Sequence, residues 1–452
     1  MSVVAETDTP IDPPTAGTPV VFESALIDYV SAIYDANAQK VVIAYRDTGN
    51  SNYGTAIVGT VSGTSISFGT PVVFESASST YISATYDANA QKVVIAYRDV
   101  GNVSYGTAIV GTVSGTSISF GTAAVFESAS SAFMSTTYDS NAQKVVIAYR
   151  DAGNSNYGTA VVGTVSGTSI SFGTAVVFES AVIEHISATY DANAQKVVIA
   201  YQDQGNSDYG TAIVGTVSGT SISFGTAVVF ESASSANTSA TYDSTNQKVV
   251  IAYRDGGNLS YGTAIVGTVS GTSISFGTAV VFESANSTNI SATYDSTIQK
   301  VVIAYSDGGN SSYGTAIVGT VSGTSISFGT AVVFESASNS YMSATYDSNA
   351  QKVVIAYRDD GNSAYGTGVV LSNTSTTTNL TAENYIGISD AAYSDATTAT
   401  IQLVGSVDDA QTGLTAGQKY YVQTDGSLGL TADSPEVFAG TAVSSTQLIV
   451  KG

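Results

Sequence analysis

A 52-residue unit repeats without insertion through most of this chain, and it limits the available folds more than any other feature. The string Gln-Lys-Val-Val-Ile-Ala-Tyr occurs seven times at that spacing, and we number the copies as repeats 1 to 7 in chain order. The copies begin at Gln39, Gln91, Gln143, Gln195, Gln247, Gln299 and Gln351. Units of about 20–50 residues at a fixed period build solenoids, propellers or arrays.

Each unit is predicted to form four short β-strands joined by tight turns. In repeat 2, segments rich in Val, Ile, Thr and Tyr give strands a to d at Tyr81–Tyr86, Lys92–Arg98, Tyr105–Val113 and Ser117–Phe126. Asp-Ala-Asn-Ala, Asp-Val-Gly-Asn and Ser-Gly-Thr separate them, and these residues supply the positive φ angles and side-chain caps of turns. Four antiparallel strands in about 40–50 residues are typical of a propeller blade.

The ends of the repeat region predict a closed ring. Strands such as Val41–Ala44 are apolar on both faces, which indicates sheets stacked face to face. Strand a carries small residues, as crowding near a central axis requires. Repeat 7 stops after strand c, and residues 17–24 are an extra strand d before repeat 1. Because closure removes exposed edges, we predict an all-β, seven-bladed β-propeller over residues 17–372, closed by the N-terminal strand. A solenoid is the alternative.

The flanking segments lack the repeat. The proline-containing residues 1–16 are expected to be a flexible arm, and the polar residues 373–380 a linker. Residues 381–452 are expected to form a small C-terminal β domain for attachment or oligomerisation. Its strand-like segments are 385–389, 398–407, 418–424 and 436–451.

Composition excludes several kinds of site. The net charge is −22 and only 11% of residues are charged, so a basic stripe for duplex nucleic acid is absent from the sequence. Without cysteine and with His185 as the single histidine, thiolate and multi-histidine metal sites are excluded. No apolar run approaches the roughly 18 residues of a membrane span, and no export signal is evident. We therefore expect a protein made in a cytoplasm, without membrane insertion, cofactor or metal.

An aspartate opens every turn between strands b and c, in the pattern Asp-x-Gly-Asn-x-x-Tyr-Gly-Thr. The seven residues are Asp47, Asp99, Asp151, Asp203, Asp255, Asp307 and Asp359. The turn resembles the Asp-box of sialidase-type propellers, with Tyr in place of the usual Trp. We interpret the carboxylate as an acceptor of backbone N–H bonds that holds the hairpin. Calcium binding is the alternative, although one carboxylate per turn falls far short of about six to eight oxygen ligands.

The copies disagree mainly in the segment after Phe-Glu-Ser, between strands d and a. A second variable place follows the turn aspartate, and in a propeller both connections lie on one face. Loops on rigid scaffolds carry function, and aromatic rings beside polar side chains suit sugar recognition. The predicted ligand-binding residues are Asp28, Tyr29, Tyr81, Phe133, Glu184, His185, Asn237, Asn289 and Tyr341. The alternatives are drift of the loops after duplication and, for His185, an ordinary packed histidine.

The C-terminal region and the repeats resemble proteins of bacteriophage particles. Gly413–Val422, Asp425–Leu428, Ala439–Ala442 and Gln447–Val450 resemble the C-terminal β domains of tail-fibre and other virion appendage proteins. The repeat strings are similar to those of marine phage structural proteins. The resemblance implies a virion surface protein made in the host cytoplasm. It also implies a host cell-surface glycan or receptor, other virion proteins and further copies of the chain as partners.

Three functions remain open at this point. The first is non-enzymatic receptor binding by the propeller, and the second is a purely architectural role in a virion fibre or decoration. The third, a sialidase-type glycosidase, requires an arginine cluster, a Tyr–Glu pair and an acid near the axis. The five arginines at the ends of strand b are expected to lie away from the axis strand, as parts of the scaffold. The repeated glutamates are equivalent copies, whereas a catalytic pair needs two distinct environments, so no catalytic residue is predicted.

Overall fold

The computed structural model describes residues 3–5, 13–372, 385–389, 400–423, 427–432 and 436–451. The chain divides into two compact units, one of residues 13–374 and one that combines residues 1–12 with 375–452. The described residues form 36 strands and four short 3-10 helices, which confirms the all-β prediction. No helix in these ranges is long and apolar enough to cross a membrane.

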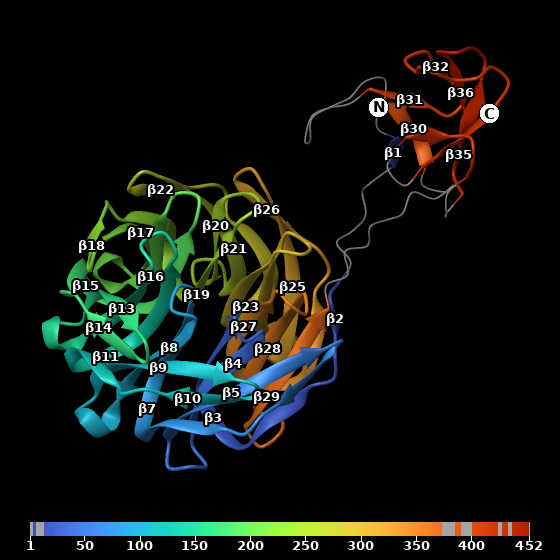
Figure 1. The fold of residues 1–452 in the computed structure, drawn as a ribbon. Helices are drawn as coiled ribbons and strands as arrows, with labels where there is room; N and C mark the ends of the chain where they lie inside the picture. Colours follow the sequence, from blue (N-terminus) through green and yellow to red (C-terminus); the bar gives the residue numbers. More distant parts are fainter. Residues whose placement is uncertain are drawn as a thin grey trace. The chain divides into compact units, whose positions relative to one another are not determined.

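Residues 13–372 form a closed ring of antiparallel sheets (Figure 1). In repeat 2, β7 (Val72–Asp87), β8 (Lys92–Asp99), β9 (Tyr105–Ser114) and β10 (Ser117–Phe120) pair in that order. The start of β11 (Ala124–Asp139) extends β10 along the same edge of β9. Each inner strand is assigned below to the repeat whose Lys-Val-Val strand it pairs with, so β7 belongs to repeat 2.

The other repeats contribute equivalent elements. The remaining inner strands are β3 (Val20–Asp35), β15 (Val176–Asp191), β19 (Val228–Asp243), β23 (Val280–Asp295) and β27 (Val332–Asp347). The second strands are β4 (Lys40–Asp47), β12 (Lys144–Asp151), β16 (Lys196–Asp203), β20 (Lys248–Asp255), β24 (Lys300–Asp307) and β28 (Lys352–Asp359). The third strands are β5 (Tyr53–Ser62), β13 (Tyr157–Ser166), β17 (Tyr209–Ser218), β21 (Tyr261–Ser270), β25 (Tyr313–Ser322) and β29 (Tyr365–Ser372). The short outer strands are β6 (Ser65–Phe68), β14 (Ser169–Phe172), β18 (Ser221–Phe224), β22 (Ser273–Phe276) and β26 (Ser325–Phe328). The 3-10 helices are η1 (Val100–Asn102), η2 (Ala152–Asn154), η3 (Gln204–Asn206) and η4 (Gly308–Asn310).

The connection between predicted strands d and a differs from the expectation. It is part of one 16-residue strand in each repeat, such as β7, whose first half pairs with β5 of the preceding sheet and whose second half pairs with β8. The prediction of a variable surface loop here is therefore wrong. Strand d, expected to run unbroken over Ser117–Phe126, is instead divided between β10 and β11. A strand that serves two neighbouring sheets links each repeat to the next through backbone hydrogen bonds.

The N-terminal strand closes the ring, as predicted. β29 of repeat 7 pairs with the first half of β3 and with β2 (Thr15–Ala16). Residues 15 and 16, expected in the flexible arm, thus belong to the ring. Closure leaves β29 paired along both edges, so the final sheet presents no open third strand.

The sheets pack face to face through the apolar second strands. Val41–Tyr45 and their copies are fully buried, which confirms the prediction from their two apolar faces. The hydroxyl of the buried tyrosine in each second strand donates a hydrogen bond to a glutamate at the edge of the preceding sheet. Tyr97, for example, donates to Glu75 Oε2 at 3.0 Å. Burial raises the pKa of Glu75, and the nearby Asp99 adds to that rise. Each sheet interface therefore combines apolar packing with one polar link.

A circle of hydrogen bonds surrounds the axis and explains the small residues of strand a. The backbone N–H of Ala84 donates to Ser31 Oγ at 3.0 Å, and the same bond joins each inner strand to the next. The circle closes where Ala32 N–H donates to Ser343 Oγ at 2.9 Å, across 311 positions of sequence. A larger side chain at these serine positions would separate the inner strands and lose the bond.

The second unit contains two small sheets. One has the order β1 (Val3–Ala5), β30 (Tyr385–Ser389), β31 (Ile401–Leu403). The other has the order β32 (Val407–Asp408), β36 (Leu448–Val450), β35 (Phe438–Ala442), β33 (Lys419–Val422), β34 (Leu428–Gly429). Ile388 of the first sheet is buried in one core with Tyr420 and Leu448 of the second. The segment expected as one strand over 436–451 is a pair of strands, β35 and β36, and that expected over 398–407 is also divided. The predicted linker 373–380 lies outside the described residues.

Candidate functional site

One residue in each inner strand adopts a left-handed backbone conformation. It is the fifth residue of the variable segment, with φ of 51° at Tyr81 and 49–51° across the seven copies. The strand pairing shifts at this place, because Thr80 lies opposite Arg98 and Ser83 opposite Ala96, so two residues bulge against one. A bulge changes the direction of a side chain, and a left-handed non-glycine residue costs about 1–2 kcal/mol. Such strain is concentrated at functional sites.

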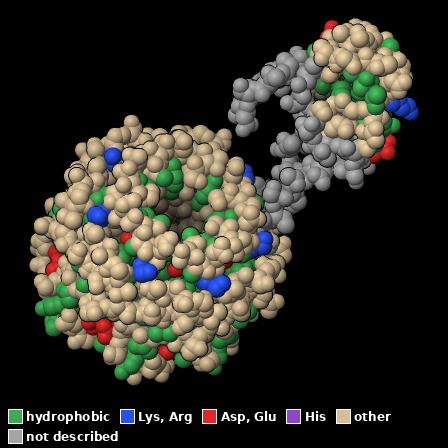
Figure 2. Space-filling model, in the orientation of Figure 1, with side chains coloured by type: hydrophobic (Ala, Val, Ile, Leu, Met, Phe, Trp, Pro, Cys, Tyr) green, Lys and Arg blue, Asp and Glu red, His purple; other side chains and the backbone are tan. Residues whose placement is uncertain are grey.

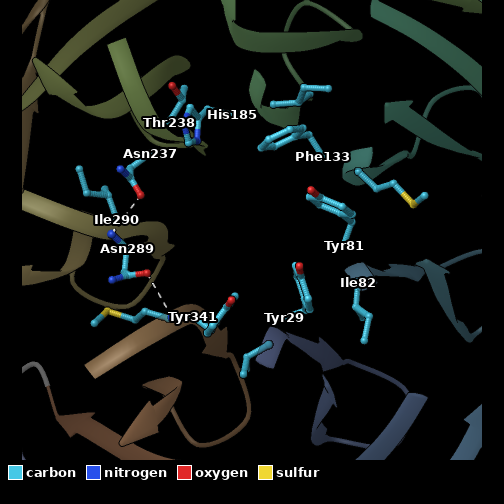
Figure 3. A pocket seen from close by; sticks show the side chains of 14 residues that line it. Tyr29, Tyr81, Ile82, Phe133, His185, Asn237, Thr238, Asn289, Ile290 and Tyr341 are labelled. Atoms are coloured by element: carbon cyan, nitrogen blue, oxygen red, sulfur yellow. Dashed lines mark hydrogen bonds between the residues drawn. The ribbon is translucent and has the colours of Figure 1, made fainter. Parts of the chain in front are cut away.

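The bulges turn two side chains from every repeat into one central cavity of about 310 Å³. This volume lies at the lower end of the roughly 300–1,000 Å³ of small-ligand sites. The first residue of each pair was predicted: Tyr29, Tyr81, Phe133, His185, Asn237, Asn289 and Tyr341 (Figure 3). The structure brings all seven together, but on the inner strands at the end nearest the b–c turns and not on surface loops.

The second residue of each pair was missed. These residues are Val30, Ile82, Met134, Ile186, Thr238, Ile290 and Met342. Six are apolar, and Thr238 is the exception. Comparison of the seven copies could have identified Thr238, because every other repeat places an apolar side chain there.

One side of the cavity is aromatic. Ring centroids are 5.3 Å apart for Tyr341 and Tyr29, 5.3 Å for Tyr29 and Tyr81, and 5.1 Å for Tyr81 and Phe133. His185 continues the arc at 5.7 Å from Phe133. Tilted rings at these separations attract one another, so the arc is held by contacts between neighbouring repeats.

The other side of the cavity is formed by amides. Asn237 Oδ1 accepts from the backbone N–H of Asn289 at 3.2 Å, and Asn289 Oδ1 accepts from that of Tyr341 at 3.2 Å. The Asn289 amide donates to Ser306 Oγ at 3.2 Å. Figure 3 shows the two asparagines across the cavity from Tyr81. The cavity therefore offers stacking surfaces on one side and hydrogen-bonding groups on the other.

Arginines form a second layer behind the aromatic rings, which corrects the expectation that they lie far from the axis strand. The guanidinium carbons of Arg46, Arg98, Arg150 and Arg358 lie 4.7–5.0 Å from the ring centroids of Tyr29, Tyr81, Phe133 and Tyr341. A cation at this distance from an aromatic face is attracted to it. The sequence could not show this, because only the bulge brings the fifth residue over the arginine. On the face of the ring seen in Figure 2, the centre is hollowed and the Lys and Arg side chains are spaced singly.

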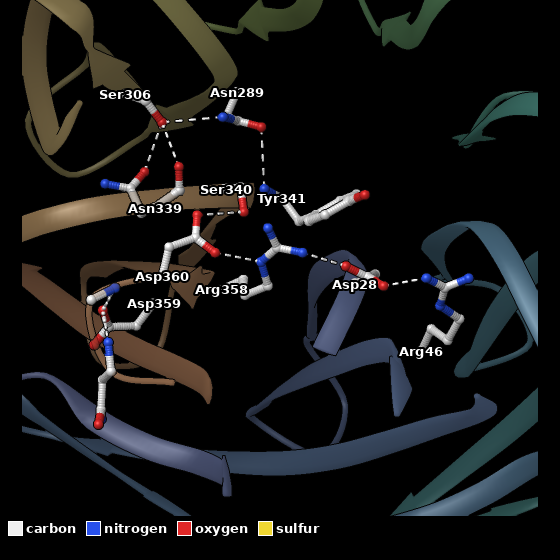
Figure 4. Close-up of polar contacts among 12 residues, drawn as sticks. Asp28, Arg46, Asn289, Ser306, Asn339, Ser340, Tyr341, Arg358, Asp359 and Asp360 are labelled. Atoms are coloured by element: carbon white, nitrogen blue, oxygen red, sulfur yellow. Dashed lines mark hydrogen bonds and ion pairs between the residues drawn. The ribbon is translucent and has the colours of Figure 1, made fainter. Parts of the chain in front are cut away.

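Two predicted site residues, Asp28 and Glu184, lie in this second layer and do not line the cavity. Asp28 forms ion pairs with Arg46 and with Arg358 (2.5 Å) (Figure 4), and its side chain is 7% exposed. Glu184 pairs with Arg150 at 2.8 Å. Both carboxylates thus hold arginines of repeats 1, 3 and 7 in place. Asp360, from the second variable place, adds a further contact to Arg358 at 2.6 Å.

Burial shifts the pKa values of titratable side chains that line the cavity. Burial raises the pKa of Tyr29, and the neighbouring Tyr81 adds to the rise; burial also raises the pKa of Tyr341. Both hydroxyls are therefore protonated at neutral pH and can donate hydrogen bonds. Burial lowers the pKa of His185, against the opposing charge of Glu184, and Arg254 lowers it further. The imidazole is therefore neutral at pH 7.

The turn aspartates have the structural role that was predicted. Asp151 Oδ1 accepts from the backbone N–H groups of Gly153 and Asn154 at 2.9 and 3.2 Å. Glycine is required in this turn, because a Cβ at Gly101 would lie 2.4 Å from the Cβ of Ala77. Over the described ranges, no group of three or more carboxylate or imidazole side chains is arranged to hold a metal ion.

Comparison with known proteins gives matches among solved structures. No protein-family model and no curated protein matches the chain. The BP39L lectin from Burkholderia pseudomallei aligns with a TM-score of 0.56 at 10% identity, over 78% of this chain and 97% of its own. A leech intramolecular trans-sialidase aligns at 0.47 with 9% identity, over 83% and 70%. AofleA from Arthrobotrys oligospora aligns at 0.43 with 10% identity, over 73% and 95%. At this identity, the BP39L match shows a shared ring of β-sheets.

Proposed function

We propose that this protein is a non-enzymatic, seven-bladed β-propeller lectin that binds a glycan in its central cavity. The observation that carries the proposal is the set of seven strained residues that aim aromatic and amide side chains into one cavity. Aromatic faces stack on the apolar face of a sugar, and amides both donate and accept hydrogen bonds to its hydroxyls. BP39L, which shares the fold, is a lectin.

The placement of the carboxylates favours binding over hydrolysis. Among the described residues, Asp28 and Glu184 are engaged in ion pairs behind the rings, and the fourteen lining residues include no carboxylate. Glycoside hydrolysis ordinarily uses two carboxyl groups on either side of the bond that breaks. A turnover assay on sialosides and other aryl glycosides checks this point: measurable hydrolysis would overturn the non-enzymatic assignment.

The test of glycan binding is a glycan array followed by calorimetry on the full chain. The variant Tyr29→Asn/Tyr81→Asn/Phe133→Asn replaces three aromatic rings by the residue of repeats 5 and 6, which tolerates the left-handed conformation. Loss of three stacking contacts should weaken binding about tenfold or more. An unchanged affinity, or the absence of any glycan ligand, would contradict the proposal.

A matched control comes from the same face of the ring. Val103 and Leu259 are also left-handed and are 74% and 77% exposed, outside the cavity. Val103→Ser/Leu259→Ser introduces the residue that repeats 1 and 3 carry there. This double variant should bind glycans as the unmodified chain does.

We also propose that the protein acts on the surface of a phage particle, as a tail fibre, spike or capsid appendage. This proposal rests on the sequence resemblance of the repeats and the C-terminal region. Assembly as a homo-oligomer would multiply weak binding of one ring by avidity. Antibodies against the ring should label intact particles and block their adsorption to host cells. Labelling without inhibition would favour the architectural role.

A further inference from the structure

The fifth repeat differs from the others in what surrounds its arginine. Arg46, Arg98, Arg150 and Arg358 each have an aromatic ring and at least one polar side-chain partner. Arg254 has neither in the described part of the chain. Its Nε is buried without a hydrogen-bond partner, as are those of Arg46 and Arg150, but it lacks the ring and the polar partner that these two have. The residues that the strand pairing places beside Arg254 explain both absences.

The missing ring follows from the residue at the bulge. The strand register places Ala236 opposite Arg254, so the bulge residue next to this arginine is Asn237. Its short side chain gives Arg254 no aromatic face. The residue before the bulge is Asp28 in repeat 1 and Glu184 in repeat 4, and these carboxylates pair with other arginines. The same position holds Ala236 in repeat 5 and Thr288 in repeat 6, so it supplies no carboxylate to Arg254.

A second unpartnered group lies in the same sector. Thr238 lines the cavity, the residue is nine-tenths buried, and its Oγ1 lacks a hydrogen-bond partner. Every other repeat has an apolar residue at this position. A buried hydroxyl without a partner is destabilising, and a hydrogen bond to a ligand oxygen would relieve that cost.

The side chains next to Thr238 add hydrogen-bond donors to the cavity wall and no negative charge. Asn237 uses its Oδ1 to accept from Asn289, which leaves its amide N–H groups to face a ligand. The imidazole of His185 lies beside Asn237 and Thr238, across the cavity from Tyr29 (Figure 3). Glu184, the nearest carboxylate along the chain, is paired with Arg150 on the other side.

We propose that this sector, formed by Arg254, Thr238, Asn237 and His185, binds the carboxylate of an acidic sugar. The inference rests on the proposed glycan-binding function and specifies its ligand class. The aromatic arc stacks on the pyranose ring, and Arg254 donates charge-assisted hydrogen bonds to the carboxylate. The net charge of −22 repels anions only weakly at this depth, since surface charges are screened over about 8 Å at physiological salt.

The test compares two sugars that differ at one carbon. Calorimetry on the full chain measures binding of methyl α-D-galactopyranosiduronate and of methyl α-D-galactopyranoside, whose C6 is a carboxylate in the first and a hydroxymethyl group in the second. The corresponding glucuronide and glucoside give an independent pair. The uronates should bind about tenfold or more tightly than the neutral sugars.

The variants assign that preference to the sector. Arg254→Gln introduces the residue that repeat 4 carries as Gln202, so the fold should tolerate it, and the preference for uronates should disappear while neutral sugars still bind. Thr238→Val should weaken uronate binding severalfold. Lys248→Gln removes one positive charge from the other end of the same strand, β20, and should leave the preference intact.

The outcomes separate the inference from the function it rests on. Binding of neutral sugars without preference for uronates, or a preference that survives in Arg254→Gln, would overturn the inference and leave the lectin assignment standing. Failure of both kinds of sugar to bind would overturn the acidic-sugar site, and the glycan array would then decide the lectin assignment.

Discussion

The polar link between neighbouring sheets gives a prediction that can be worked out from the structure. Tyr97 is fully buried and donates to Glu75 Oε2 at 3.0 Å. The same bond joins Tyr201 to Glu179 and Tyr305 to Glu283. A hydrogen bond to a charged group is worth about 1.5–3 kcal/mol. Because these glutamates are half-buried and water can replace part of the bond, we expect about 1–2 kcal/mol per site.

The perturbation is the triple variant Tyr97→Phe/Tyr201→Phe/Tyr305→Phe, which removes three hydroxyls from non-adjacent repeats. Separated sites add in free energy, so the variant should lose about 3–6 kcal/mol. For a ring of this size, that corresponds to about 4–8 °C in Tm, from an unfolding entropy of about 2 cal/mol/K per residue. Thermal unfolding followed by circular dichroism at pH 7 measures the shift.

The pH dependence distinguishes a hydrogen bond from a packing effect. The folded-state pKa of Glu75 lies above 4.5, and the tyrosine hydroxyl lowers it by favouring the carboxylate. The bond therefore stabilises the charged form, and its contribution is lost as the pH falls through the folded-state pKa. The deficit in Tm should shrink at pH 4. An equal deficit at both pH values would refute the hydrogen-bond argument, because a packing defect does not titrate.

A matched control uses tyrosines of the same three repeats. Tyr105, Tyr209 and Tyr313 begin the third strands and are partly exposed. The triple change of these residues to Phe removes the same three hydroxyls from sites open to water. It should alter Tm by less than about 2 °C, within the usual range of surface substitutions.

Three further predictions concern stability. The folded-state pKa of Glu75 and its six copies is raised, so above pH 4.5 these glutamates bind more protons in the folded ring than in the unfolded chain. Tm should therefore rise as the pH falls from 7 toward 4.5, and a steady fall in Tm would contradict this. The folded-state pKa of His185 is lowered, so below about pH 6.5 the unfolded chain binds more protons at this site and the folded ring is destabilised. His185→Asn removes this effect, so Tm should rise more on acidification than in the unmodified chain. Gly101→Ala should cost about 1–3 kcal/mol by denaturant unfolding, because its Cβ would lie 2.4 Å from that of Ala77; no loss would show that the turn can shift.

The sequence alone determined the parts of this protein that repetition and local chemistry control. The 52-residue period, the apolar runs such as Val41–Ala44 and the unpaired strand at residues 17–24 predict a closed ring of stacked sheets, and the structure has it. The turn aspartates were interpreted correctly, since their bonds reach only two or three residues along the chain. The variable positions were also identified by comparing copies.

The direction in which those variable side chains point depends on the tertiary structure. A left-handed residue inside a strand has no reliable signature when it is Tyr, Phe or His, because the cost of the conformation is offset by long-range strand pairing. The bulge at Tyr81 turns a presumed surface loop into the wall of a cavity and places Arg98 behind the ring. The isolation of Arg254 likewise depends on contacts between strands from two repeats. Long-range packing, which no short stretch of sequence encodes, thus set the geometry of the site.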